Sequence, residues 1–137
     1  MIIDSHEHMM LPTEMQLQMM DAAGIDKTIL FCTAPHPEKA SSLNALETEM
    51  DELYKVLSGS NSIEANIIRQ QKNISELISI IRKHPDRFGG FGSVPLGMSF
   101  NETQDWITDY IISNSLLGIG EFTPGNEQQI LQLDTVF

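Results

Sequence analysis

Four short apolar segments alternate with helical patterns along the chain, and this alternation limits the fold more than any other feature. The first predicted strand begins at Ile2 and Ile3, and the others cover residues 28–32, 88–94 and 116–122. Because helical segments separate the strands, we expect parallel strands with the helices packed outside them. The 137 residues are enough for one α/β domain with a sizeable core.

The helical segments are predicted from apolar spacing and from residues that typically begin or end helices. One apolar stripe covers residues 43–57, a turn follows at 58–62, and a further helix leads to Pro85. The predicted order is therefore β-α-β-αα-β-α-β. The expected end signals are Thr13 with Gln16, Gly24, Asn73 with Glu76, and Asn101.

Two histidines follow the first apolar run directly, in the stretch DSHEHM. Side chains alternate along a strand, so His6 and His8 share one face, and Asp4 lies one step deeper on it. Two imidazoles at this spacing can bind one metal ion. A His-x-His pair is a short motif that also occurs without a metal. Its place at the end of a predicted buried strand favours a metal site, because α/β folds carry their chemistry there.

The fourth predicted strand ends in GIGEF, which places Glu121 at the same level as the two histidines. An open dinucleotide-binding sheet would have a glycine-rich turn after its first strand, and DSHEHMMLPTE has none. The alternation of strands and helices with ligands at strand ends therefore favours a closed barrel. Glu121 is therefore expected at the same end of the sheet as the candidate ligands His6 and His8.

Composition narrows the range of partners. Eight Lys and Arg against 19 Asp and Glu give a formal net charge of −11, which repels nucleic acid and anionic membranes. The single Cys32 excludes an internal disulfide, and no signal peptide or transmembrane-length apolar run is evident. We therefore expect a cytoplasmic protein with a small-molecule substrate and neither a nucleic acid nor a membrane partner.

The segments MIIDSHEHM, DKTILF, KHPDRFGGFGSVPL and LLGIGEFTP resemble, in this order, the first four strands of the metal-dependent amidohydrolase superfamily, particularly amidohydrolase family 2. This resemblance implies a distorted (β/α)₈ barrel of the TIM type, in which His6 and His8 bind a divalent metal, with Zn²⁺ favoured. The strand-four ligand of the family is a lysine or a glutamate, and Glu121 matches the members that carry glutamate. The predicted metal ligands are therefore His6, His8 and Glu121, and Asp4 is expected to orient one of the histidines. The resemblance further implies histidines ending strands five and six and an aspartate ending strand eight.

A complete (β/α)₈ barrel needs about 250 residues. We therefore expect residues 1–137 to form a single domain that is the N-terminal half of such a barrel, about four βα units, ending in the fourth outer helix. The catalytic base is then expected outside this chain. The uncovered sheet edges of a half barrel predict a homo-oligomer or association with the missing half.

The two remaining histidines and the single cysteine are weaker candidates for the site. His36, just past the second strand, is a possible substrate contact, although a loop histidine without a role is the simpler interpretation. His84 closes a helix and Cys32 has no base beside it in the sequence, so structural roles are favoured for both. Arg87 and Asp86 are expected to pair at the opposite end of the barrel.

The expected function is that of a metal-dependent hydrolase in which a metal-activated water attacks an amide, ester or related bond of a small molecule. In the truncated form it is expected to be inactive. Two alternatives remain open. One is a metal-dependent non-oxidative decarboxylase of the same branch, and the other is a non-catalytic half barrel that self-associates.

Overall fold

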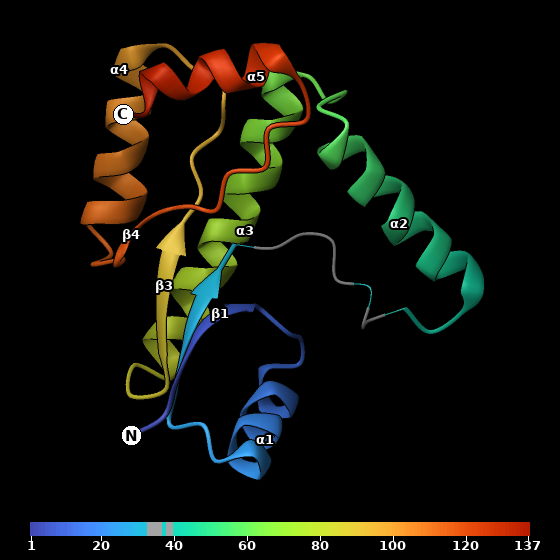
Figure 1. Ribbon diagram of the computed structural model, residues 1–137, viewed down its shortest axis with the longest axis vertical. Helices are drawn as coiled ribbons and strands as arrows, with labels where there is room; N and C mark the ends of the chain where they lie inside the picture. The colour runs from blue at the N-terminus through green and yellow to red at the C-terminus, as the bar shows by residue number, and fades with distance from the viewer. Residues whose placement is uncertain (33–36, 38–39) are drawn as a thin grey trace.

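A four-stranded parallel sheet is the centre of the fold. The computed structural model describes residues 1–32, 37 and 40–137. The strands are β1 (Ile3–His8), β2 (Lys27–Phe31), β3 (Phe88–Gly92) and β4 (Gly118–Ile119), and they pair in chain order. All three pairings are parallel, and the cyan β2 and gold β3 arrows in Figure 1 point the same way. The carboxyl ends of the strands therefore meet at one edge.

Helices connect the strands, as the alternating pattern predicted. They are α1 (Thr13–Ala23), α2 (Leu43–Leu57), α3 (Ile63–Lys83), α4 (Phe100–Trp106) continued by the π-helical η2 (Ile107–Ile112), α5 (Glu127–Leu131) and the 3₁₀ turn η3 (Gln132–Thr135). In Figure 1, α3 runs behind the sheet and α2 stands apart from it. The α/β half-barrel order of elements is confirmed. None of the helices in the described ranges is both long enough and apolar enough to cross a membrane.

The main core lies between the sheet and α3. Leu30 of β2 and Leu77 of α3 are fully buried, and Phe88 of β3 packs in the same cluster. Every second residue of β2 and β3 is buried, because alternate side chains point towards the helices. A second cluster, formed around Ile74 and Trp106, joins α3 to α4 and η2. The helices thus cover one face and leave the other for the site.

Close packing of this core depends on glycine in β3. A Cβ atom at Gly92 would collide with the side chains of Ile111, Ile74 and Leu116. Glycine therefore lets α3 and η2 lie directly against the strand.

Two predicted helix caps are wrong. Asn73 lies inside α3 and is buried, because α3 runs unbroken from Ile63. The cap is Ser62, whose hydroxyl accepts the Ala65 N–H at 3.2 Å. Similarly, Ser99 rather than Asn101 caps α4, since Ser99 and Glu102 form a reciprocal capping box.

The predicted capping pair of Thr13 with Gln16 is also wrong, because Pro12 precedes α1 and no side chain caps it. Gln16 instead holds the chain that leaves β1. Its Nε2 donates to the His8 carbonyl at 2.9 Å, and its Oε1 accepts the Met10 N–H at 3.1 Å. The Gln16 side chain is 3% exposed, so this pair of bonds is shielded from water.

Arg87 anchors the opposite end of the sheet, but its partner is Asp21 rather than the predicted Asp86. The guanidinium lies 2.8 Å from the Asp21 carboxylate and also donates to the carbonyls of Ile25 and Asp26. The Asp26 carboxylate accepts the Ile2 N–H, and this bond lowers the pKa of Asp26. The starts of β1, β2 and β3 are thereby tied together.

The strand boundaries differ from the predicted ones mainly at β4. Residues 116–122 were predicted, but only Gly118 and Ile119 pair with β3. β1 contains an irregularity between Asp4 and Glu7, where three steps along β1 match two along β2. Such a bulge bends a strand locally and commonly lies next to functional residues.

We predict that Gln16→Leu lowers the free energy of unfolding by about 1–3 kcal/mol, because the part-buried His8 carbonyl and Met10 N–H lose their partner. Urea denaturation followed by circular dichroism measures the change. Gln18→Leu is the matched control, since Gln18 is exposed on the same helix, and it should change stability by less than about 0.5 kcal/mol. Equal effects of the two substitutions would contradict the role given to Gln16.

Candidate metal centre

His6 and His8 lie at the carboxyl end of β1 and turn towards the face of the sheet that the helices leave open. Their side chains are 53% and 48% exposed, so both rings are accessible from solvent. His6 lies within the bulge and His8 follows it, and the two rings meet edge to face with centroids 5.5 Å apart.

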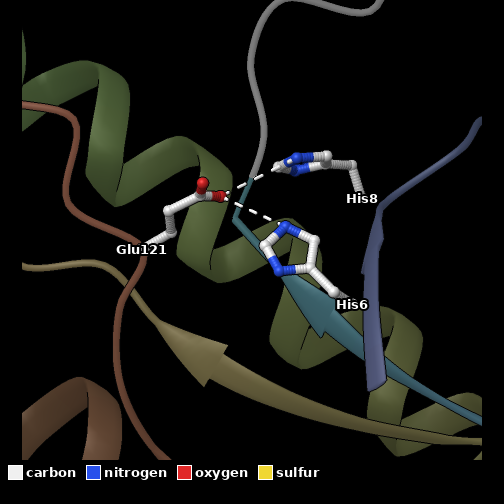
Figure 2. Close-up of side chains that lie close together, drawn as sticks. All are labelled: His6, His8 and Glu121. Carbon is white, nitrogen blue, oxygen red and sulfur yellow. Dashed lines mark ion pairs between the residues drawn. The ribbon is translucent and has the colours of Figure 1, made fainter. Parts of the chain in front are cut away.

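Glu121 reaches the histidines from the other end of the chain. It follows β4 by two residues, and Figure 2 shows its carboxylate directed towards both imidazoles. Its Oε2 lies 3.6 Å from the His6 Nε2 and 3.8 Å from the His8 Nε2. The three residues that the sequence singled out as ligands are therefore brought together.

The spacing of these three donors fits a metal ion. One donor atom from each residue lies within 4.8 Å of the others. In a tetrahedral site with bonds of 2.0–2.1 Å, neighbouring ligand atoms are about 3.3 Å apart. The two measured nitrogen–oxygen distances exceed this by only a few tenths of an ångström. Imidazole nitrogen with carboxylate oxygen is a donor set that suits Zn²⁺, Mn²⁺ and related ions.

Aromatic rings support His6 from below. The His6 ring stacks on Phe31 with centroids 4.4 Å apart, and Phe31 stacks on Phe91 at 5.3 Å. Phe31 and Phe91 are register partners in β2 and β3. Gly118 completes this row, because a Cβ there would lie 2.7 Å from the Phe91 ring. The sequence signal for this stack is a phenylalanine in each of two neighbouring predicted strands, in TILF and in GGF. The sequence analysis did not predict the stack from it.

The two acids of DSHEHM contact the backbone of the histidines. The Asp4 carboxylate accepts the His6 N–H at 3.1 Å, so it holds the bulged backbone of a candidate ligand. The Glu7 carboxylate accepts the His8 N–H at 3.3 Å and lines the cavity beside His8.

A cavity of about 480 Å³ opens beside His8 and Glu121. Its apolar wall includes Met9, Leu53 and Val56, and its polar wall includes residues of α3. This volume lies within the range of small-molecule sites, which are mostly apolar with a few converging polar groups. His8 and Glu121 thus border a space large enough for a small substrate.

The other candidates of the sequence interpretation lie outside the cluster. Cys32 lines the cavity, and burial raises the pKa of its thiol, which disfavours the nucleophilic thiolate. His84 is the C-cap residue of α3 and its ring meets Phe88 edge to face, in keeping with a structural role. His36 lies outside the described residues.

No protein-family model matches this sequence, and no curated protein is similar to it at a significant level. Solved structures do match. The 2,6-dihydroxybenzoate decarboxylase from Rhizobium has a TM-score of 0.55 and 16% identity, over 98% of this chain and 47% of its own. The 5-carboxyvanillate decarboxylase from Novosphingobium aromaticivorans, solved with bound manganese, has a TM-score of 0.56 and 18% identity, over 99% and 46%.

A third match is a protein from Staphylococcus aureus assigned as an amidohydrolase, with a TM-score of 0.52 and 17% identity, over 98% of this chain and 43% of its own. The chain therefore spans just under half the length of the solved structures it matches. At these identities the likeness is one of fold. The chain has the fold of half a TIM-type barrel, a four-stranded parallel sheet with helices outside it, as the alternation of strands and helices predicted.

Proposed function

We propose that this chain is the metal-binding half of a metal-dependent hydrolase of the amidohydrolase type, acting on a small molecule. The convergence of His6, His8 and Glu121 at one edge of the sheet carries the proposal. Zn²⁺ is the proposed ion, and manganese, which is bound in one of the matched decarboxylases, is the alternative. A bound divalent ion would lower the pKa of a water and polarise a carbonyl oxygen.

The chain's own residues then have distinct tasks. His6 and His8 offer neutral nitrogens, and Glu121 contributes a negative charge that offsets part of the charge of the ion. Asp4 holds the His6 backbone, and Gln16 holds the backbone beyond His8. The positions of both imidazoles are therefore fixed from the backbone side, which lowers the entropy lost on binding an ion.

Hydrolysis is proposed in preference to decarboxylation because the strand-four position carries a glutamate, as in the hydrolytic members that the sequence resembles. Decarboxylation is the second candidate, supported by the names of two matched structures. The remaining ligands and the catalytic base are proposed to come from a complementary half of the barrel. In a complete barrel, release of carbon dioxide from the substrate would identify decarboxylation and would contradict hydrolysis of an amide or ester.

We predict that His6→Ala or His8→Ala lowers the affinity for Zn²⁺ and Mn²⁺ by at least about tenfold, since each removes one of three ligands. Isothermal titration calorimetry of the 137-residue chain measures this. His84→Ala and His36→Ala are the matched controls and should leave the affinity unchanged. Equal losses in all four variants, or no metal uptake by the unsubstituted chain, would refute the site.

We predict that Phe31→Ala weakens metal uptake by about threefold to tenfold, because the His6 ring loses its stacking partner and gains freedom that binding must remove. Phe100→Ala is the control, since Phe100 is 59% exposed at the start of α4. The same titration serves as the measurement. An unchanged affinity in Phe31→Ala would show that the stack does not position His6.

We also propose that the isolated chain self-associates. β1 and β4 are the outer strands of the described sheet, and Ile2 and Ile3 at the β1 end are 59% and 48% exposed. Unpaired strand edges pair readily with another chain, and apolar burial is worth about 25 cal/mol per Å². Light scattering should therefore give the mass of two or more chains at physiological salt. A monodisperse monomer would contradict this prediction.

A further inference from the structure

The cavity beside the candidate metal centre holds one group that the proposed metal chemistry does not use, the guanidinium of Arg69. Arg69 lies on α3 in the cavity wall, together with Gln70 and Asn73. A second, smaller cavity is lined by Arg69, Gln70 and Glu121 as well, so Arg69 and the candidate ligand Glu121 border the same two cavities. Among the described lining residues Arg69 is the only cation from Lys or Arg.

Arg69 is incompletely paired within the described part of the chain. Its one hydrogen bond there is to the Asn66 amide oxygen at 3.2 Å, and its buried Nε–H has no acceptor. No carboxylate of the described residues lies within ion-pair distance of it. Burial is the larger effect on the pKa of Arg69 and lowers it. The charge of Glu52 acts on Arg69 and raises its pKa, but the Glu52 carboxylate is bound to Lys55 at 2.7 Å.

A second polar atom of the same wall also lacks a partner. The buried Oε1 of Gln70 has no hydrogen-bond partner in the described residues, and Gln70 lines the cavity beside Arg69. Buried polar groups are normally hydrogen-bonded, and leaving one unsatisfied costs stability. Two unsatisfied polar atoms, the Arg69 Nε and the Gln70 Oε1, therefore belong to the α3 wall of one cavity, where a polar ligand would offset their cost.

The chemistry of the walls defines that ligand. A guanidinium is planar and pairs best with a planar carboxylate, to which it can donate two parallel hydrogen bonds. Apolar side chains line the same cavity, with Leu53 and Val56 of α2 and Met9 beyond β1. A small molecule with an apolar body and a carboxylate fits both kinds of side chain and the volume of about 480 Å³.

We propose that Arg69 is a specificity-determining residue that binds a carboxylate of the substrate at the α3 wall of the cavity. The inference rests on the proposed function only in taking this cavity as the substrate site. Because the chain carries a net charge of −11, an anionic substrate is otherwise repelled, and Arg69 offsets this repulsion where the substrate lies.

Benzoate and benzamide test the proposal, since they have nearly the same shape and differ in charge. Binding of each to the 137-residue chain is measured by NMR titration in the presence of EDTA, so that no metal contributes. We expect benzoate to bind about tenfold more tightly than benzamide, with shifts at the side-chain amides of Gln70 and Asn73. Arg69→Gln should remove the preference, and Arg69→Lys should keep part of it.

Arg82→Gln is the matched control, because Arg82 is also on α3 and also donates to an asparagine, Asn114, at 2.8 Å, but does not line the cavity. It should keep the preference for benzoate. No preference in the unsubstituted chain, or equal losses in Arg69→Gln and Arg82→Gln, would overturn the proposal. The metal titration of the His6 and His8 variants uses no benzoate, and the benzoate titration uses no metal. Each experiment therefore tests one proposal, and its failure does not decide the other.

Discussion

The burial of α3 against one face of the parallel sheet is the interaction on which the rest of the structure depends. Leu30, Leu77 and Phe88 are almost fully enclosed there, and removing such side chains from water is the main driving force for folding. Because the helices occupy this face, the opposite face and the carboxyl edge remain accessible. Side chains of β2 and β3 that do not point towards the helices point towards the open face, and among them Phe31 and Phe91 support the candidate metal centre.

Parallel pairing brings distant parts of the sequence to one place. β1 and β4 are the outer strands of the sheet, yet their carboxyl ends lie on the same side, so His6, His8 and Glu121 meet across two intervening strands. Phe31 and Phe91 fill the space between these outer strands. The intervening strands thus supply the floor of the site, while the outer strands supply its donors.

The parts of this structure that follow a simple periodicity were predictable from the sequence. Alternating apolar segments gave the order of strands and helices, and strand-end polar residues gave His6, His8 and Glu121 as neighbours. Features set by tertiary contacts were not predictable. Asn73 has the spacing of a helix cap, but the packing of Ile74 and Leu77 continues α3 through it. Gln16, Phe31 and Arg69 acquire their roles from partners distant in the sequence, which no local pattern specifies.

The loose attachment of α2 has a thermodynamic consequence. None of its residues is buried, and Tyr54 and Leu57 are 63% and 47% exposed, although Leu53 and Val56 line the cavity. In this arrangement much of the apolar surface of the wall is still hydrated. A ligand with an apolar body would remove that surface from water, and burial of apolar surface on binding gives a negative heat-capacity change. The enthalpy of ligand binding at this cavity should therefore become more favourable as temperature rises.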